Sequence, residues 1–257
     1  MSYERELEFT RRIAQAAGKN AREIREGYFS VETKADGSPV TAADASNERL
    51  IREAIEREFP DDGILGEEGS SKAGSTGRRW IIDPIDGTRD FLRGNRFWCV
   101  LLALEEAGDC VVGVAHFPML DETYWATRGG GAYCNGVRLR TSNVTSLDGS
   151  CYCPNGLFLR EARPYLSAAM DLVQRCWSMR SFGGALDACM VAAGQADIWF
   201  EPKVAPWDLA PLKVILEEAG AEFFALDGSS RIDRGSALGC APGLADEVRK
   251  AFGVPAS

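Results

Sequence analysis

Apolar positions divide the chain into a first half patterned mainly as strands and a second half in which helices and strands alternate. Near the N-terminus they recur at helical spacing, which predicts an amphipathic helix over residues 4–26. The polar, turn-rich segment 34–39 predicts a hairpin or loop. Thr41, three residues before Asp44, is typical of the capping box that begins a second helix.

Short apolar runs between turn residues predict the remaining elements. In the first half we expect strands at residues 80–82, 100–104, 111–115 and 123–126, and another after the glycines at 129–131. In the second half we expect helices at 163–174, 186–193, 209–219 and 244–252, and strands at 198–200, 222–225 and 237–240. The run at Trp80 predicts a buried strand that stops at Asp83 and Pro84. This mixture predicts an α/β fold.

The chain of 257 residues contains no repeat, low-complexity tract or long linker. We therefore expect one domain over residues 1–257, with a sheet-rich half at about 1–140 and an alternating half at about 141–257. With 45% apolar residues, a chain of this length can bury a sizeable core.

Acidic residues outnumber basic ones, 38 to 29, for a formal net charge of −9. This balance argues against nucleic acid or an anionic membrane as a partner, because binding either needs clustered Lys and Arg. An anionic ligand would need another source of attraction, which points towards a metal. The charged N-terminus leads into no apolar signal core, and the longest apolar run, 97–104, is too short to span a bilayer. We therefore expect a cytoplasmic protein.

The eight cysteines are scattered, with no C-x-x-C pair, which favours a reduced intracellular protein over a disulfide or zinc framework. His116 is the only histidine and lies in a strand-like run. A His-rich metal site is therefore excluded, and a Ser-His-Asp mechanism would depend on this one residue, for which we expect a structural role.

Carboxylates lie at the ends of the predicted elements: Glu67 and Glu68 between two glycines, Asp83 and Asp86 after the apolar strand, and Asp208 at a helix start. Each alone has an ordinary explanation as a solvated turn, a tight turn or a first-turn helix acid. Together they flank a strongly apolar strand without accompanying His or Cys. An all-oxygen ligand set suits a hard cation, Mg²⁺ first.

Gly87 and Thr88 follow these acids directly. If a helix begins there, their free N–H groups can hold phosphate oxygens, and glycine lets the backbone approach closely. Metal carboxylates beside a phosphate-holding helix end indicate metal-assisted phosphoryl transfer to water.

Three motifs, at residues 66–69, 83–88 and 207–208, and a fourth segment at 36–44 resemble the inositol monophosphatase family of Mg²⁺-dependent, lithium-sensitive phosphatases. The resemblance covers roughly residues 30–220. It implies a layered αβαβα sandwich of the inositol monophosphatase / fructose-1,6-bisphosphatase type. It also implies a homodimer.

The resemblance also implies two or three Mg²⁺ ions. Glu67, Asp83 and the Ile85 carbonyl resemble the first site, while Asp83, Asp86 and Asp208 resemble the second, with Asp83 bridging. A third, weaker ion would depend on Glu67.

The same matching implies the catalytic roles. Thr88 and Asp44 would orient and deprotonate the attacking water, with Glu68 behind the metal ligands. Gly87 and Thr88 would bind phosphate. No histidine is then needed, because a metal lowers the pKa of bound water.

The resemblance places the alcohol-binding wall in two segments of the second half. Its members are Gly183, Gly184, Ala185, Asp187 and Glu201. We expect a small phosphorylated alcohol of the inositol monophosphate type. The sequence around Gly183 departs from the usual inositol pattern and resembles the histidinol-phosphatase branch, so histidinol phosphate is an alternative. A 3′-phosphoadenosine-type nucleotide and a non-catalytic partner of the transcription machinery are further alternatives.

Overall fold

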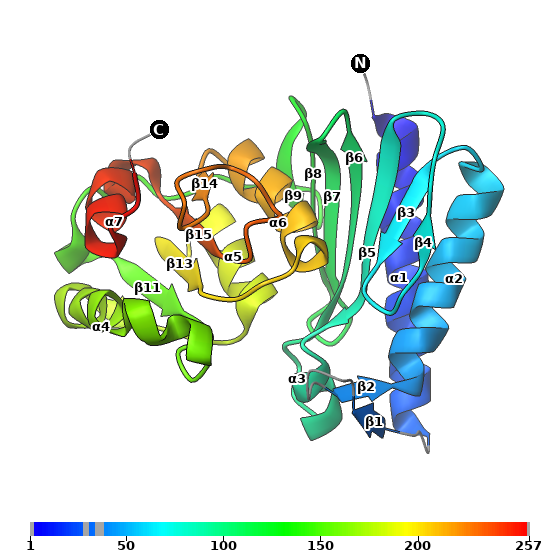
Figure 1. Cartoon of the computed structure of the whole chain (residues 1–257), viewed down its shortest axis with the longest axis horizontal. Coiled ribbons are helices and arrows are strands. Elements are labelled where there is room, and N and C mark those ends of the chain that lie inside the picture. The colour runs from blue at the N-terminus through cyan, green and yellow to red at the C-terminus, as the bar shows by residue number, and fades with distance from the viewer. Residues whose placement is uncertain (1–2, 28–30, 34–38, 256–257) are drawn as a thin grey trace.

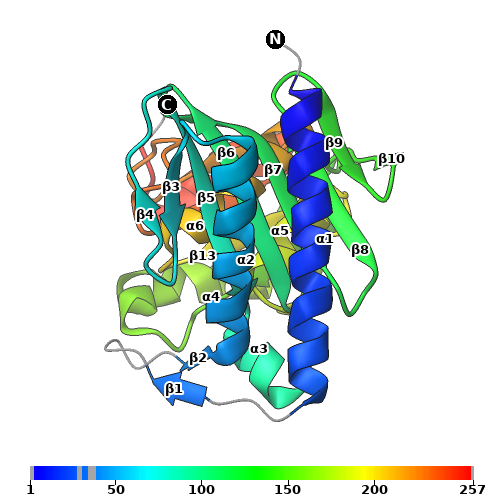
Figure 2. The ribbon, with the colours of Figure 1, turned by 90° about the vertical axis from the view of Figure 1, so that its right-hand side faces the viewer.

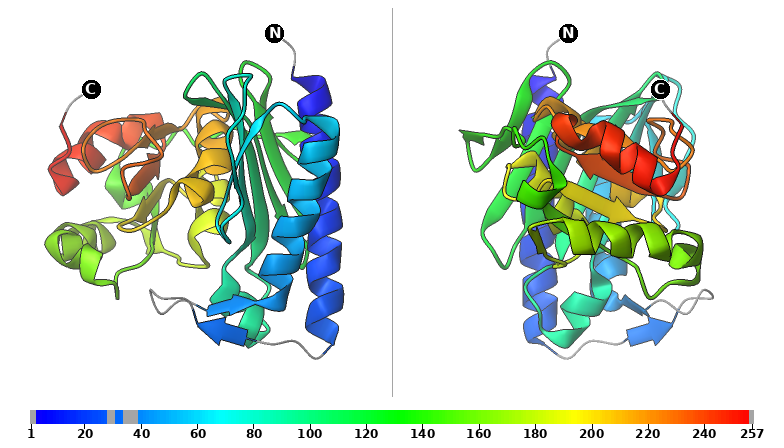
Figure 3. Two further views of the ribbon diagram at one scale, coloured as in Figure 1. Left: turned by 45° about the vertical axis from the view of Figure 1, so that its right-hand side comes forward. Right: turned by 90° about the vertical axis from the view of Figure 1, so that its left-hand side faces the viewer.

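The computed structural model describes residues 3–27, 31–33 and 39–255. Its elements form five layers, αβαβα, which confirms the predicted architecture (Figure 1). A helix pair covers the outer face of each of two sheets, and a third pair lies between the sheets (Figure 3). From the N-terminal side, the pairs are α1 (Glu4–Glu26) with α2 (Ala42–Glu58), α5 (Gly184–Ala192) with α6 (Pro206–Glu218), and α4 (Leu166–Arg175) with α7 (Ala245–Phe252).

The larger sheet has eight strands in the order β10-β9-β8-β7-β6-β5-β3-β4. Figure 2 shows α1 and α2 lying across one of its faces. Its strands are β3 (Gly63–Gly66), β4 (Ser71–Lys72), β5 (Arg78–Asp86), β6 (Cys99–Glu106), β7 (Asp109–Phe117), β8 (Glu122–Thr127), β9 (Gly131–Cys134) and β10 (Val137–Arg138). The strands predicted from residues 80 to 131 are confirmed. Most of them extend beyond the predicted limits because their outer residues also pair.

The prediction that a strand stops at Asp83 and Pro84 is wrong. β5 continues to Asp86, which pairs with Cys99, and the register shifts between Asp83 and Asp86. A bulge accommodates the proline, which has no N–H for the ladder, and re-aims the side chains around it. The strand therefore carries both aspartates instead of ending before them.

The second sheet has five strands in the order β12-β11-β13-β15-β14. They are β11 (Cys151–Pro154), β12 (Ser178–Met179), β13 (Ile198–Glu201), β14 (Glu222–Phe224) and β15 (Ala237–Cys240). The four predicted helices form, but that expected over 163–174 begins as a 3₁₀ turn, η2 (Arg160–Tyr165), because Pro164 cannot donate within an α-helix. The strands β3 and β11 were not predicted.

α6 is buried on nearly every side from Leu209 to Leu216, because it packs between the two sheets. This position carries Asp208, in its first turn, to the end of the larger sheet. That the two halves fold as one domain stays a prediction.

Three smaller expectations concern individual residues. Residues 34–38 of the expected hairpin lie outside the described residues, and the flanking strands β1 (Val31–Thr33) and β2 (Pro39–Thr41) pair antiparallel. All eight cysteines are described and are free thiols. Half-buried His116 lies with Nδ1 2.9 Å from Thr123 Oγ1, and burial lowers its pKa to about 4.

No helix in the described part of the chain has the length and apolarity to cross a membrane.

Candidate active site

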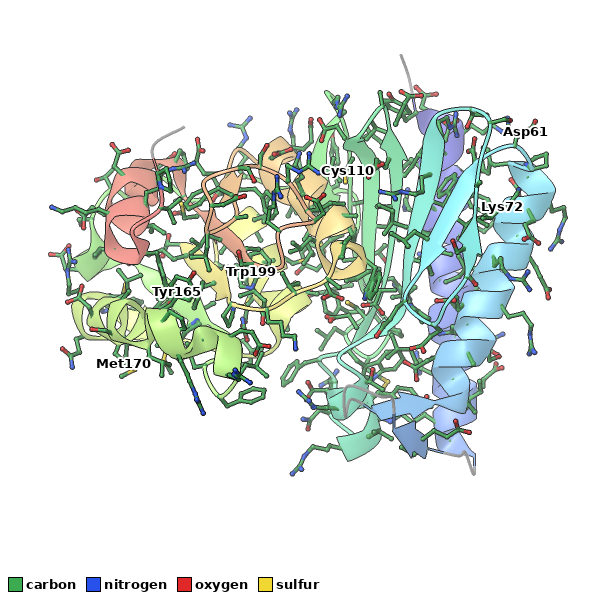
Figure 4. The ribbon with its side chains drawn as sticks, in the orientation of Figure 1. Asp61, Lys72, Cys110, Tyr165, Met170 and Trp199 are labelled. Atoms are coloured by element: carbon green, nitrogen blue, oxygen red, sulfur yellow. The ribbon has the colours of Figure 1, made fainter. Side chains whose placement is uncertain are left out.

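A cavity of about 400 Å³ opens where the end of β5 meets the central helix layer and β13. This is a size that suits a small organic molecule. Acidic and helix-end residues form one side of it, and glycines, apolar residues, Glu201 and Lys203 form the other. Trp199, labelled in Figure 4, reaches this cavity from β13.

Three predicted metal ligands come together at the first of these sides. Asp83, Asp86 and Asp208 each direct a carboxylate oxygen to one point, with the three oxygens within 4.8 Å of one another. Burial, together with the nearby Asp208 and Glu67, raises the pKa of Asp86 to about 7. Burial also raises the pKa of Asp83, with contributions from Glu67, Asp208 and Asp86. So many like charges in a buried site, all offering oxygen, fit a hard divalent cation.

Local backbone geometry aims these carboxylates. Within the bulge of β5, the Ile85 N–H donates to Asp83 Oδ1 at 3.0 Å. Asp208 is the third residue of α6, and its Oδ2 accepts from the Ala205 N–H at 2.8 Å. Both aspartates thus have one carboxylate oxygen held by a backbone N–H close to them in the sequence.

Glu67 and Glu68 take different sides of the loop that follows β3. β3 runs parallel to β5, so its end lies beside the aspartates, and the Glu67 N–H donates to the Ile82 carbonyl at 3.1 Å. Glu67 lines the active-site cavity. Glu68 lines a different hollow, on the outer side of the loop.

Thr88 and Asp44 meet across two elements. The Thr88 hydroxyl lies 3.5 Å from Asp44 Oδ1 and 3.2 Å from the Ile85 carbonyl oxygen. The other oxygen, Asp44 Oδ2, accepts from the N–H and the hydroxyl of Thr41, which completes the predicted capping box. Burial raises the pKa of Asp44. The capping and catalytic explanations of this residue therefore coexist, because each uses a different oxygen.

A six-residue helix, α3 (Thr88–Arg93), begins where it was predicted, with Gly87 as its N-cap. Gly87 has a φ of +83°, and a Cβ there would lie 3.1 Å from the Phe97 carbonyl oxygen, so glycine is required. At a helix start the N–H groups of Gly87 and Thr88 have no intrahelical acceptor. Both residues line the cavity.

Four of the five predicted substrate-wall residues line the cavity: Gly183, Gly184, Ala185 and Glu201. Asp187 does not. It is fully buried, and its carboxylate accepts from the Asn155 side-chain amide at 2.9 Å and from the Phe182 N–H at 3.1 Å. Asn155 follows the unpredicted strand β11, so this support could not be seen in the sequence.

The carboxylate of Glu201 has no hydrogen-bond donor among the described residues. Its oxygens approach Gly156 and Gly184 so closely that a Cβ at either glycine would lie 3.1 Å away. Burial raises its pKa well above the usual range, and Asp86 and Asp208 add to the shift.

Sequence reasoning missed the aromatic part of the wall. Phe97, Phe158 and Trp199 line the cavity beside Glu201. Phe158 is 78% exposed at the surface, and the Arg89 guanidinium lies 5.8 Å from its ring centre. Because the three aromatic residues are far apart in the sequence, no local pattern indicated that they form one wall.

The family model that matches this chain is that of the inositol monophosphatase family, over residues 3–251. The chain belongs to the inositol monophosphatase family. A histidinol-phosphatase of Mycobacterium tuberculosis is 41% identical over 224 residues, covering 85% of this chain and 86% of that protein. An inositol-1-monophosphatase of Rhizobium meliloti is 37% identical over 196 residues, covering 75% and 74%.

The solved structure of a Thermotoga maritima IMPase superposes with a TM-score of 0.88 at 31% identity, covering 96% of each chain. The family therefore has the architecture found here, and these phosphatase relatives identify the chain as a phosphomonoester hydrolase.

Proposed function

We propose that this protein is a Mg²⁺-dependent phosphatase that hydrolyses the phosphate ester of a small amino alcohol, with histidinol phosphate as the substrate. The observation that carries the reaction class is the convergence of Asp83, Asp86 and Asp208 beside the Thr88–Asp44 pair. When bound, two or three Mg²⁺ ions would supply charge for the phosphoryl oxygens and a more acidic water. Glu67, the three aspartates and the Ile85 carbonyl would hold them.

The protein's own residues would bind the phosphate and transfer the proton. The N–H groups of Gly87 and Thr88 hold phosphoryl oxygens, which fixes the ester in line with the attacking water. The Thr88 hydroxyl accepts a proton from that water and passes its own to Asp44 Oδ1. Burial favours the protonated form of Asp44, so the carboxylate is suited to receive it.

The choice of substrate depends on Glu201. Glu201 is half-buried in the cavity wall without a donor among the described residues, and an ammonium group would satisfy both its hydrogen bonds and its charge. Apolar and aromatic side chains lie around it, including Phe97, Phe158 and Leu159. The cation on this side of the cavity, Lys203, pairs with Glu161. An organic part with one cation and a flat ring complements this wall. The relative from Mycobacterium tuberculosis carries the same name as this activity.

Inositol monophosphate is the second candidate, because Glu201 can also accept from a hydroxyl. A relative named for this activity is 37% identical. A neutral polyol could donate to Glu201 but would not balance its charge, which weighs against it.

The test is phosphate release from histidinol phosphate, inositol 1-phosphate, 3′-phosphoadenosine 5′-phosphate and an aryl phosphate, with and without Mg²⁺. We expect the largest kcat/KM for histidinol phosphate and loss of activity on chelation. Preference for inositol 1-phosphate would reject the substrate, and full activity after exhaustive chelation would reject the mechanism.

We further propose a homodimer, on the family likeness alone, and a cytoplasmic location, on the eight free, scattered cysteines. Light scattering during size exclusion tests the dimer. A role as a partner of the transcription machinery stays a prediction, and intact metal carboxylates favour the enzyme.

A further inference from the structure

Helix α2 presents two buried carboxylates one turn apart, and only the first, Asp44, has a role in the reaction proposed above. The second, Glu48, is 3% exposed. Its Oε2 accepts from the Glu68 N–H at 2.6 Å, and its Oε1 accepts from the Ser70 N–H at 2.8 Å. Both oxygens are thus directed at backbone donors of the loop that carries Glu67.

The loop is shaped to receive this carboxylate. A Cβ at Gly66 would lie 2.5 Å from Glu48 Oε2, so any larger residue would displace the carboxylate. The Gly66 N–H donates to the Ser70 carbonyl at 2.7 Å, which closes the loop around Glu48. Among the described residues Glu48 forms no ion pair, so its charge is stabilised by these amides.

The two anchors lie on either side of Glu67. Its own N–H is held by the Ile82 carbonyl on β5, and the next N–H along the chain, that of Glu68, is held by Glu48. The peptide groups on both sides of the Glu67 Cα are therefore fixed. Fixing them sets the direction in which the Glu67 side chain leaves the backbone, towards the cavity.

We propose that Glu48 is a positioning residue that holds Glu67 in place for the cation, so that α2 orients both the Asp44 base and a metal ligand. This inference rests on the proposed function. Groups that orient metal ligands typically contribute 10- to 100-fold to metal affinity. Glu48 contributes through the backbone of the loop, without contact with the ion or the substrate.

The test is Glu48→Gln, which keeps the shape but turns an NH₂ group towards one of the two N–H donors. We expect Mg²⁺ binding to the substrate-free protein, measured by calorimetry, to weaken about tenfold or more. We expect kcat at saturating Mg²⁺ to change by less than about threefold, and hydrogen exchange at Glu68 and Ser70 to accelerate in the metal-free protein. Glu56→Gln, on the same helix and partly exposed, is the matched control and should leave all three unchanged.

Gly66→Ala is the second variant, because its methyl group would displace the same carboxylate without altering Glu48. It should reproduce the loss of Mg²⁺ affinity, which keeps the proposal testable if Glu48→Gln folds poorly. Wild-type Mg²⁺ affinity in either folded variant, even with a lower Tm, would overturn the positioning role. Glu67→Gln distinguishes failure of the positioning role of Glu48 from failure of the proposed metal site. If it binds Mg²⁺ as the wild type does, the proposed metal site itself is wrong.

Discussion

The two ends of the cavity are built in opposite ways. At the metal end, Asp83, Asp208 and Asp44 each have one carboxylate oxygen held by a group within three residues in the sequence. At the alcohol end, Glu201 accepts no hydrogen bond from any described residue, and glycines and apolar side chains lie around it. The metal end is therefore organised before any ligand arrives, whereas Glu201 at the alcohol end needs the substrate to supply a donor.

Because of this difference, we expect the metal end to set the rate for every ester and the alcohol end to set which ester is preferred. Phosphate and metal contacts are common to all phosphomonoesters, so a preorganised metal end accelerates every substrate alike. A half-buried carboxylate that the substrate covers distinguishes substrates, because an analogue without the matching donor leaves it unpaired. Changes at the metal end should thus lower activity towards all esters, and changes at Glu201 should lower it selectively.

The largest effect is expected at Asp83, the carboxylate that would lie between two ions if the family resemblance holds for this site. Asp83→Asn should lower kcat/KM about 10³-fold for both histidinol phosphate and an aryl phosphate, because an interaction with the phosphoryl charge is lost for each. Glu68→Gln is the control, since Glu68 lines the outer hollow, and it should lose far less. Equal losses in the two variants would contradict the bridging role of Asp83.

A smaller loss is expected at the proton relay. Thr88→Ala should lower kcat about 10²-fold for both esters, which is typical of removing general base catalysis. Mg²⁺ binding, followed by calorimetry, should be almost unchanged because the hydroxyl holds no ion in this arrangement. Thr88→Ser, which retains the hydroxyl, should recover most of the rate. Unchanged kcat, or loss of metal binding, would show that Thr88 has another role.

The metal end should also be sensitive to pH without its cation. The pKa of Asp86 is about 7 in the folded protein. Between about pH 4 and 7, Asp86 is therefore protonated in the folded protein but ionised in the unfolded chain. A raised pKa stabilises the folded metal-free protein at low pH, and this contribution is lost as the pH rises through about 7. Mg²⁺ must displace the proton, so its apparent affinity should fall by up to about tenfold per pH unit below 7.

This prediction is checked by Mg²⁺ titration calorimetry in buffers of different ionisation enthalpy. At least one proton should be released per binding event near pH 6, because the pKa of Asp83 is raised as well, and fewer should be released near pH 8. The rise in Tm caused by Mg²⁺ should increase over the same range. A Mg²⁺ affinity independent of pH would contradict the raised pKa.

The smallest and most selective effect is expected at the alcohol end. Glu201→Gln should lower kcat/KM for histidinol phosphate about tenfold, equivalent to about 1.4 kcal/mol, while an aryl phosphate is hydrolysed almost as before. An amide can still accept from a hydroxyl but cannot neutralise an ammonium, so inositol 1-phosphate should lose less. Equal losses for all three esters would show that Glu201, like the metal ligands, acts on the phosphate step that all esters share. Glu201 would then not determine the choice of substrate.

Residues close together in the sequence could be assigned by sequence reasoning. The capping box of Thr41 and Asp44, the turn at Gly87 and the spacing of Asp83 and Asp86 all depend on hydrogen bonds within a few positions. The helical and strand periodicities are also local. Glu67 and Asp208 were candidates because they lie at the ends of predicted elements, and resemblance to a known family added Glu201, which no local pattern connects to them.

Only the tertiary structure determined the hydrogen-bond partners of the remaining carboxylates. Glu48 reaches amides 20 and 22 positions away, and Asp187 is held by an amide 32 positions away, so no short-range pattern distinguishes either from an ordinary helix acid. The bulge that carries β5 past Pro84 depends on pairing with β6, which propensity alone does not reveal. Local hydrogen bonding is encoded in neighbouring residues, whereas the partner of a buried carboxylate is chosen by how separate elements pack.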